Sequence, residues 1–538
     1  MKRKILIGGA WPYANYSLHV GHLAALLPGD VIARYFRQNG DEVMYVSGTD
    51  SHGTPITERA KKEGTNPSEI AHKYHKEFVE AFHALNFSYD FYTATYEPYH
   101  ESHVQQMLVE MKNNGYLYEK EKQQDYCETC GKFLADREIT GLCPVCGKPA
   151  KGDQCDACLT SFDPSDLKEK HCITCGNPTV QRPNHEIVFA LSKFQSKLET
   201  YYAENHKVWR TNAINETKKY LEQGLPDRDA TRSLDWGIEV PFEGYEDKRV
   251  YVWIEAVMGY LTAAMKVAEE RGEDFDAWMQ DGDDLISYYI HGKDNIPFHT
   301  VIYPAIIMAV GRGWQLPKRI VSSEYVKLGE DKMSKSRGNL VTILELANQF
   351  ESDSVRFFFT ANNPERRDIS YSEEELIAAH NKFLCGAFGN FVNRNVSFLK
   401  KKFKGVVPAG VVDAEIVAQT EKMYADIGGK IEAGELRAAV ELMLQYIQDA
   451  NKYYDAQAPW TQVKAEDQTD FNNTTATCLY IIANMSNLLA PVLPDGCAKI
   501  RTMLELDETP SWTPINIKDG LVLGDCPILY TRIQDEKK

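Results

Sequence analysis

Eight of the twelve cysteines lie between Cys127 and Cys175, where they form four Cys-x-x-Cys pairs. Two residues between thiolates let one tight turn place both sulfurs on one tetrahedral ion, and four thiolates make a closed, structural zinc site. The surrounding segment, residues 116–182, has little apolar periodicity and cannot build an ordinary core. We therefore predict two structural Zn²⁺ ions with these ligands: Cys127, Cys130, Cys143, Cys146, Cys155, Cys158, Cys172 and Cys175.

A disulfide framework and an iron–sulfur cluster are the alternatives for these pairs. The opening MKRKILIGGAW has only a short apolar run before polar chain, so it is interpreted as a first strand and not as a secretory signal. We expect a cytoplasmic protein, in which clustered cysteines serve as metal ligands. The loop lengths favour pairing in sequential order, and the residues alone leave the pairing open.

Length and composition limit the number of domains and the classes of protein that the chain can belong to. Its 538 residues correspond to three or four domains, and 43% hydrophobic with 25% charged residues excludes wholesale disorder. No apolar stretch is long enough to span a membrane. The net charge of −17 argues against a protein that coats nucleic acid indiscriminately, although a local basic face stays compatible with it.

Strand and helix patterns alternate at the N-terminus and resume after the cysteine-rich segment. Apolar residues predict a strand over 5–9, a helix over 23–38 and a strand over 42–47, which is the βαβ unit of a parallel sheet. Further strands are expected at 249–253, 285–290 and 319–322, as the same sheet continued after an insertion. Beyond Ser370 the pattern is helical, most clearly over 436–454 and 472–489, and no long linker separates the parts.

The sequence WPYANYSLHVGH, residues 11–22, joins the first strand to the first helix. A helix N-terminus offers unpaired N–H groups and partial positive charge, so it is a natural phosphate site. Gly21 lets a ligand approach the backbone, and His19 and His22 lie on one face of the first turn. The competing interpretation is that both histidines simply cap the helix.

A second motif, KMSKSRGN over 332–339, carries two lysines three residues apart. Flanking serines and the following Arg-Gly make a cationic loop suited to a polyphosphate, although by itself it is an ordinary solvated turn. Neither motif is a Walker loop, because no GxxxxGK[ST] sequence occurs.

Together the two motifs resemble the catalytic pair of the class I aminoacyl-tRNA synthetases, and the residues between them resemble the methionyl-tRNA synthetase family. The matching blocks run in the same order along nearly the whole chain: AWPYANYSLHVGH, GTDSHGTPI, YVWIEAVMGY, HGKDNIPFH and QAPW. Between the two motifs there is no second large, well-patterned domain. Its absence weakens the valine, leucine and isoleucine enzymes, which carry a bulky editing insertion.

The resemblance implies a two-step reaction. Methionine attacks the α-phosphate of ATP, pyrophosphate leaves, and the aminoacyl group then passes to the 3′ end of the tRNA. It implies that His19, His22, Lys332 and Lys335 are catalytic, with Lys335 contributing most, and that Mg²⁺ accompanies the nucleotide. The implied ATP-binding residues are Gly21, Gly292, Asp294, Val326 and Lys335.

For methionine, the resemblance implies a pocket formed by Ala10, Trp11, Tyr13, Asp50, Trp253, Tyr260 and His299, with Asp50 on the ammonium. Sulfur–aromatic contacts suit a polarisable thioether. The sequence departs from the commoner family pattern at Trp11, where leucine is frequent, and at Glu255 and Val257, which replace an aspartate and a proline.

The resemblance also favours a nested zinc pairing, with the inner two cysteine pairs on one ion and the outer two on the other. It implies that Asn390, Arg394 and Trp460 read the anticodon. Residues 376–412 hold six basic and no acidic side chains, which favours either a phosphate-contacting face or a plain solvated surface.

We thus expect an α/β fold: a Rossmann-type parallel sheet with an inserted zinc-binding connective domain, followed by an all-α helical bundle. The expected units are the two halves of the catalytic domain (1–115 and 236–325), the insertion (116–235), a linking segment (326–378) and the anticodon-binding domain (379–538). Because the chain ends soon after the helical region, we expect a monomer, with methionine, ATP and tRNA as partners. The rival functions are another class I synthetase, such as the cysteine enzyme, and a non-catalytic zinc-ribbon RNA-binding protein.

Overall fold

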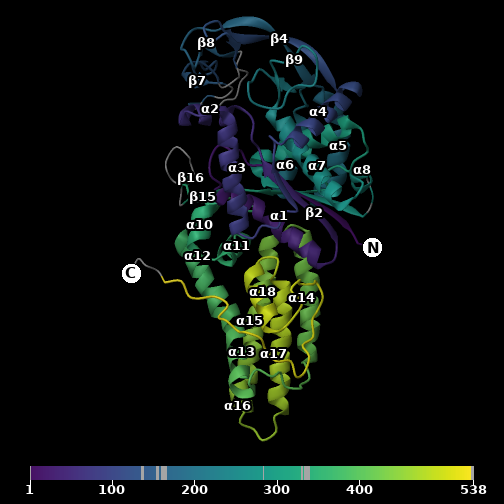
Figure 1. Ribbon diagram of the computed structural model, residues 1–538, viewed down its shortest axis with the longest axis vertical. Coiled ribbons are helices and arrows are strands. Elements are labelled where there is room, and N and C mark those ends of the chain that lie inside the picture. The colour runs from purple at the N-terminus through teal and green to yellow at the C-terminus, as the bar shows by residue number, and fades with distance from the viewer. Residues whose placement is uncertain are drawn as a thin grey trace.

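The computed structural model describes residues 2–134, 138–152, 155, 157–158, 166–280, 282, 284–328, 331–332 and 340–534. The molecule is elongated, with the cysteine-rich segment at one end and a bundle of long helices at the other (Figure 1). A parallel sheet lies between them. Within the described ranges, no helix is both long and apolar enough to cross a bilayer.

The central sheet has five parallel strands in the order β14-β13-β1-β2-β3. Their bounds are Arg319–Ser323, Leu285–Gly292, Lys4–Gly9, Glu42–Thr49 and Phe91–Ala94. The first strand, β1, therefore lies in the middle, with β2 and β3 on one side of it and β13 and β14 on the other. This reversal is the topological switch point of an open α/β sheet, and ligands bind outside the carboxyl ends of the strands at such a point. The predicted Rossmann-type parallel sheet is confirmed.

Helices cover both faces of this sheet. The long helix α1 (Val20–Gln38) follows β1 directly and buries one side against the sheet, as its apolar spacing predicts. The remaining helices around the sheet are α2 (Thr54–Glu63), α3 (Pro67–Ala84), α4 (Pro98–Asn113), α7 (Val252–Arg271), α8 (Phe275–Met279) and α9 (Tyr303–Val310).

One predicted strand is wrong. Of residues 249–253 only Arg249–Val250 belong to a strand, β12, and they pair with β11 (Thr231–Arg232) outside the central sheet. Helix α7 begins two residues later. The apolar run Val-Tyr-Val-Trp leads into α7, which is buried along most of its length. A short apolar run by itself does not distinguish a strand from the start of a buried helix.

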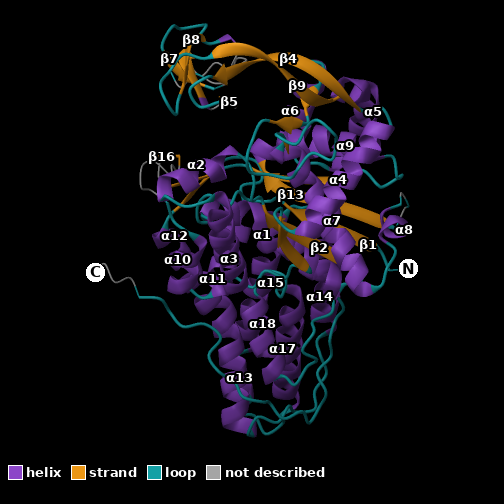
Figure 2. Cartoon of the chain, turned by 45° about the horizontal axis from the view of Figure 1, so that its top comes forward, coloured by secondary structure: helices purple, strands orange, loops and turns teal. Residues whose placement is uncertain are grey.

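The inserted segment is built on a long antiparallel hairpin. Strands β4 (Leu117–Cys127) and β9 (Val180–Phe189) pair along their length and arch away from the sheet (Figure 2). Short strands complete its two small sheets: β5 (Lys132–Phe133), β6 (Ile139–Leu142), β7 (Pro149–Lys151), β8 (Lys168–Cys172) and β10 (Arg228–Asp229). Helices α5 (Gln195–Asn205) and α6 (Thr211–Glu222) lead back to the body of the protein.

After the central sheet the chain forms a small three-stranded sheet and then helices. The strands are β15 (Val326–Leu328), β16 (Asp331–Lys332) and β17 (Ile369–Tyr371), with α10 (Ile343–Gln349) and α11 (Ser352–Ala361) between the last two. The helical part contains α12 (Glu373–Ala379), α13 (Asn390–Phe403), α14 (Ala414–Glu432), α15 (Leu436–Gln457), α16 (Pro459–Gln462), α17 (Thr469–Leu488) and α18 (Pro494–Met503).

The helical part packs directly on the sheet. One buried apolar cluster includes Ile5 and Tyr45 of the sheet together with Ile427 of α14 and Leu488 of α17. The guanidinium of Arg356, in α11, is fully buried at this junction and pairs with Asp30 of α1 at 2.6 Å. It also donates to carbonyl oxygens from both sides of the junction, those of Leu85, Pro491 and Val492. A continuous apolar core therefore joins the helical part to the sheet, in agreement with the expectation that no long linker separates them.

Candidate active site

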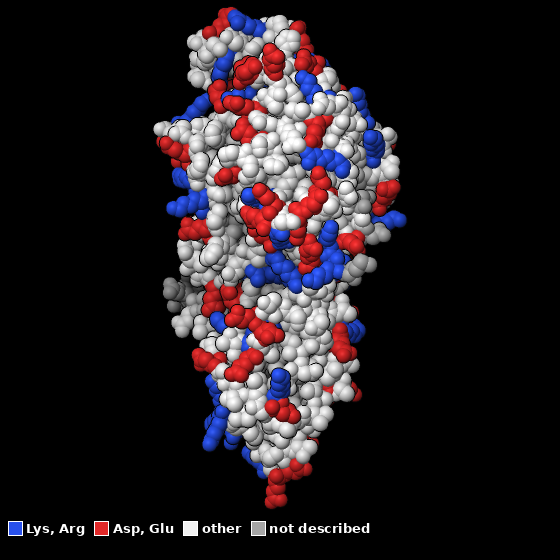
Figure 3. All heavy atoms as spheres, turned by 45° about the vertical axis from the view of Figure 1, so that its right-hand side comes forward, with Lys and Arg blue, Asp and Glu red and all other residues white. Residues whose placement is uncertain are grey.

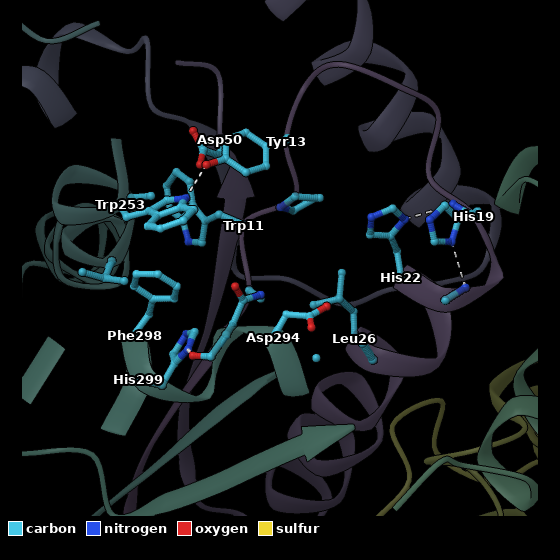
Figure 4. Close-up of a pocket in the computed structure, with 18 of the residues that line it drawn as sticks. Trp11, Tyr13, His19, His22, Leu26, Asp50, Trp253, Asp294, Phe298 and His299 are labelled. Carbon is cyan, nitrogen blue, oxygen red and sulfur yellow. Dashed lines mark hydrogen bonds between the residues drawn. The ribbon is translucent and has the colours of Figure 1, made fainter. Parts of the chain in front are cut away.

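A pocket of about 420 Å³ opens at the carboxyl ends of the central strands. Its walls come from the segment after β1 and the start of α1, from Asp50 after β2, from residues 253–260 of α7, from residues 292–299 at the end of β13 and from residues 324–326 after β14. The fold therefore brings together five chain segments that are up to three hundred residues apart. All predicted methionine and ATP residues up to Val326 line this one pocket (Figure 4).

The two histidines of the HVGH sequence stand at one end of the pocket and also cap α1. The backbone N–H of Gly21 donates to Nδ1 of His19 at 3.1 Å, and the N–H of His19 donates to Nδ1 of His22 at 3.2 Å. A neutral imidazole that accepts at Nδ1 carries its proton on Nε2. Each ring therefore carries its proton on Nε2, at the positive end of α1. The capping interpretation is confirmed, and capping through Nδ1 does not exclude phosphate binding.

The second motif is tied to the first through the backbone. Strand β15 carries Val326 into the pocket wall and pairs with β16, which contains Lys332. Past the motif, the N–H of Ile343 donates to the carbonyl of Leu18 at 2.9 Å, and Val20 donates to the carbonyl of Val341 at 3.1 Å. The segments on both sides of the lysine motif therefore lie beside the HVGH turn. Lys335 falls outside the described residues, as does the side chain of Lys332.

Asp50 and Tyr13 mark the opposite end of the pocket. Asp50 is 2% exposed, and its backbone is fixed by hydrogen bonds to Pro12 and Ala14. Burial and the neighbouring carboxyl of Glu255 raise the pKa of Asp50 well above its usual value. The hydroxyl of Tyr13 is hydrogen-bonded to the indole N–H of Trp253. Figure 4 shows these side chains grouped together, across the pocket from His19 and His22.

Aromatic and imidazole rings form the floor beside Asp50. The hydroxyl of Tyr260 lies 2.7 Å from Nε2 of His299, whose Nδ1 lies 2.8 Å from the carbonyl of Asn295. Because a carbonyl only accepts, Nδ1 carries the proton and Nε2 accepts from the tyrosine. Burial lowers the pKa of His299 to about 4, so the ring is neutral at neutral pH. The floor is thus polarisable and uncharged, as a thioether requires.

The unusual Trp11 is accommodated by two glycines. A Cβ at Gly48 would lie 2.4 Å from the indole, and a Cβ at Gly259 would lie 2.5 Å from it. Any side chain at either position would displace the ring, so the indole depends on both glycines. The sequence blocks that contain these glycines are therefore coupled to Trp11 through packing.

A turn after β13 provides the third part of the site. Asp294 accepts a hydrogen bond from the hydroxyl of Tyr325, and the ammonium of Lys293 lies over the Tyr325 ring. Lys293 also pairs with Glu324 at 2.6 Å and with Asp368 at 2.9 Å. These contacts fix the carboxylate of Asp294 at the pocket wall.

Several residues that line the pocket were not predicted from the sequence: Pro12, Asn15, Ala25, Leu26, Ala256, Asn295, Phe298, Glu324 and Tyr325. Asn295 and Phe298 lie inside the HGKDNIPFH block, so their position in the sequence was informative. Phe298 packs on Trp253 with ring centroids 4.5 Å apart. Glu324 and Tyr325 lie directly before Val326 and had no motif of their own.

The eight cysteines form two separate clusters in the inserted segment. Cys127, Cys130, Cys172 and Cys175 make one, and Cys143, Cys146, Cys155 and Cys158 make the other, with the four sulfurs of each within 4.8 Å of one another. The arrangement is nested, as the family resemblance implied, and the sequential order is wrong. Facing sulfurs lie 3.4–3.9 Å apart, too far for a disulfide and close to the roughly 3.8 Å between thiolates on one zinc ion.

The cysteine turns share one local geometry. Gly131, Gly147 and Gly176 each follow a pair, have positive φ and donate their N–H to the carbonyl of the first cysteine. This left-handed position explains glycine there and leaves both sulfurs on one side of the turn. The four-thiol sets fit a tetrahedral metal ion.

At the far end of the helical part, Arg394 and Trp460 lie together. The guanidinium of Arg394 packs over the rings of Tyr454 and Trp460 and pairs with Asp455. Trp460 is 42% exposed, and Asn390 is exposed one turn before Arg394 on α13. The predicted trio therefore shares one surface. The lysines at positions 400, 401, 402 and 404 are also exposed.

Charge over the rest of the surface is mixed. On the face in Figure 3, acidic and basic side chains are interspersed, with a band of basic groups across the middle of the molecule. The acidic total thus coexists with local basic areas, as expected for a protein that binds nucleic acid at selected places.

Comparison with known proteins agrees with this geometry. The profile described as "tRNA synthetases class I (M)" matches residues 5–396, and that of the "Anticodon binding domain of methionyl tRNA ligase" matches residues 406–538. Methionine–tRNA ligase 1 of Alkaliphilus oremlandii is 47% identical over 530 residues, which cover 98% of this chain and 97% of the relative. Methionine–tRNA ligase of Bacillus cereus strain B4264 is 45% identical and covers 95% and 94% respectively.

Among solved structures, the methionyl-tRNA synthetase of Mycobacterium tuberculosis bound by methionyl-adenylate superposes with a TM-score of 0.82. It is 26% identical, and the match covers 98% of this chain and all of that one.

Proposed function

The chain belongs to the methionyl-tRNA synthetase family of class I tRNA synthetases, and from this premise we propose how its residues divide the work of a methionine–tRNA ligase. The enzyme activates methionine with ATP, releases pyrophosphate and transfers the methionyl group to its tRNA. The observation that carries the assignment of roles is the single two-ended pocket, with the Nε2 donors of His19 and His22 at one end and Asp50 among aromatic rings at the other.

We assign ATP to the end formed by α1 and the turn after β13. His19 and His22 bind the phosphates, Gly21 lets them approach the helix N-terminus, and Asp294 with Gly292 binds the ribose beside Val326. Negative charge spreads over the phosphate oxygens in the transition state, so fixed donors stabilise it more than the ground state. Lys332 and Lys335 act on the leaving pyrophosphate.

Methionine occupies the other end, so that its carboxylate points toward the α-phosphate. Asp50 binds the ammonium, and Tyr13, Trp253, Tyr260, His299, Ala10 and Trp11 surround the thioether. Holding both reactants in one pocket replaces a bimolecular encounter by a positioned attack. Polar groups of the pocket add to the small discrimination that size alone provides among aliphatic side chains.

We assign Zn²⁺ to each cysteine cluster and Mg²⁺ to the bound nucleotide. Zinc on four thiolates supplies structural cross-linking, and Mg²⁺ would neutralise phosphate charge. The sulfur spacing and the glycine turns support the zinc assignment. With its ligands so held, the inserted segment keeps its shape without a large apolar core.

Transfer RNA is read by the helical part. Asn390, Arg394 and Trp460 contact the anticodon, since an aromatic ring and a guanidinium can stack on splayed bases and an amide can read their edges. We retain the predicted unit boundaries at residues 115, 235, 325 and 378. We also propose that the enzyme is monomeric and works in the cytoplasm, where translation takes place.

Replacement of Lys335 tests the assignment. Lys335→Ala should lower the rate of methionine-dependent ATP–pyrophosphate exchange by about a hundredfold or more, with little change in methionine affinity, because the lysine acts on the transition state. Lys61→Ala, in exposed α2, is a matched lysine control. Normal exchange by Lys335→Ala would refute the role of the motif.

A further inference from the structure

A buried carboxyl group outside the pocket wall has no role in the scheme above. Glu255 lies in the first turn of α7, between Trp253 and the pocket residue Ala256, and is 0% exposed. Its Oε1 lies 2.9 Å from Nδ1 of His52. Its Oε2 is buried and has no hydrogen-bond partner among the described residues. Burying a carboxyl oxygen without a hydrogen-bond partner costs free energy. We therefore expect a positive charge or a hydrogen-bond donor to offset this cost in the functional complex.

His52 connects this carboxyl to Asp50. The imidazole binds Glu255, and the backbone N–H of the same residue points to Oδ1 of Asp50 at 3.4 Å. His52 is itself 5% exposed, and its ring packs edge-on against Trp236. Two carboxyls are therefore held close together in a dry site by one residue between them.

We propose that Glu255 is a positioning residue for methionine, which supplies a second negative charge behind Asp50 and so strengthens the binding of the substrate ammonium. This inference rests on the proposed role of Asp50. Glu255 does not touch the substrate and acts through Asp50 and His52. The ammonium offsets part of the negative charge of the two carboxylates, while the N-terminal end of α7 stabilises Glu255 when no substrate is bound.

Electrostatics in a buried site makes such an indirect effect large. Charges separated by several ångströms interact far more strongly in a protein interior than in water, because little solvent screens them. The ionisable groups facing Glu255 are His52 and Asp50 after β2, Tyr13 after β1 and Glu101 of α4. None of them is a permanent cation, so the substrate ammonium is the natural counter-charge.

The central test is the full-length Glu255→Gln variant in methionine-dependent ATP–pyrophosphate exchange. The amide can still accept from His52 and keeps the shape of the side chain. We expect the KM for methionine to rise about tenfold, with kcat and the KM for ATP changed less than about twofold. Glu255→Asp, which restores the charge, should recover most of the loss. Glu255→Ala gives the same readout if the amide variant does not fold.

Two further measurements separate a charge effect from a structural one. Methioninol, which keeps the ammonium, should inhibit Glu255→Gln about tenfold less than the wild type, while the same alcohol without the amine should inhibit both equally. Glu273→Gln is the matched control, because it also removes a buried carboxyl oxygen without a partner, just beyond the other end of α7. It should leave every constant unchanged.

The pH profile gives a second signature. Burial raises the pKa of Glu255, and burial with Glu255 raises that of Asp50, so the pair keeps a proton at low pH. A neutral Glu255 resembles glutamine, and therefore the ratio of methionine KM between variant and wild type should grow as the pH rises above the ordinary carboxyl range and Glu255 loses its proton. The comparison is made below the pKa of the substrate ammonium.

The outcomes are distinct. If Glu255→Gln keeps the wild-type methionine KM at every pH while Asp50→Asn raises it, the inference about Glu255 is overturned and the ammonium site stands. If Asp50→Asn also keeps the wild-type KM, the proposed ammonium site itself fails. Equal increases in the KM for methionine, in the KM for ATP and in the inhibition constant of the amine-free alcohol would assign Glu255 a purely structural role and overturn the inference.

Discussion

His19 and His22 use their two ring nitrogens for different purposes. Each Nδ1 accepts a backbone N–H and so caps α1, and we propose the Nε2–H of each ring as a donor to the phosphates. These two functions are alternatives at the level of the sequence, because a capping histidine and a phosphate-binding histidine look alike there. The ring geometry that joins them depends on the helix start, and no residue pattern specifies it.

Two substitutions of His22 separate the cap from the phosphate donor. The Asn side chain can place an oxygen where Nδ1 lies, whereas the Gln amide reaches toward the position of Nε2. His22→Asn should keep the thermal stability of the wild type and lower the rate of methionine activation about a hundredfold. His22→Gln should retain more activity than His22→Asn. Thermal unfolding and exchange kinetics measure the two effects, and the reverse order of activity would contradict the assignment.

Some helices and strands could be predicted from the sequence, and others could not. The strands at 285–290 and 319–322 and helix α1 were predictable, because their apolar periodicity matches one environment along their whole length. The strand at 249–253 was mispredicted because α7 is buried on most sides and opens with strand-forming residues. Likewise, Tyr325 and Glu324 reach the pocket only because β14 ends beside β13, a tertiary fact without a local signal.

The cysteine-rich element should depend on its metal. We expect two zinc ions per chain by elemental analysis, and one in Cys172→Ser, because the two clusters share no ligand. Cys478→Ser, at a buried cysteine outside both clusters, should keep two. Since the described cysteine clusters account for most of the local core, chelation should unfold the segment and expose it to proteolysis. A metal-free protein with an intact segment would contradict the assignment.

The junction of α1 with α11 carries a fully buried ion pair. Arg356→Leu removes the fully buried one of the two arginine partners of Asp30, the other being Arg34, and leaves four carbonyl oxygens of the junction without that donor. We therefore expect a loss of about 3–5 kcal/mol in unfolding free energy. Lys422→Ala breaks an exposed pair with Asp426 on α14 and should cost no more than about 0.5 kcal/mol. Denaturant unfolding measures both, and similar values for the two variants would contradict the structural role of Arg356.

The whole molecule separates two recognition tasks along its length. The pocket lies at the carboxyl ends of the central strands, and Trp460 belongs to α16. Figure 1 shows α16 at the end of the helical part that is far from the sheet. Trp460→Ala should therefore lower tRNA charging about tenfold to a hundredfold, as expected for the loss of base stacking, while methionine-dependent exchange stays normal. Trp512→Phe, a conservative change at a buried tryptophan, should leave both reactions near wild type. Equal damage by Trp460→Ala to both reactions would count against anticodon reading.

The most direct measurement is ATP–pyrophosphate exchange by the purified chain with each of the twenty amino acids in turn. We propose that the HVGH turn and the lysine motif serve one triphosphate, next to a pocket whose carboxylate and aromatic rings accept methionine. We therefore predict fast exchange with methionine and background exchange with the other nineteen. Preferred exchange with another amino acid, cysteine for example, or no exchange with any, would contradict it.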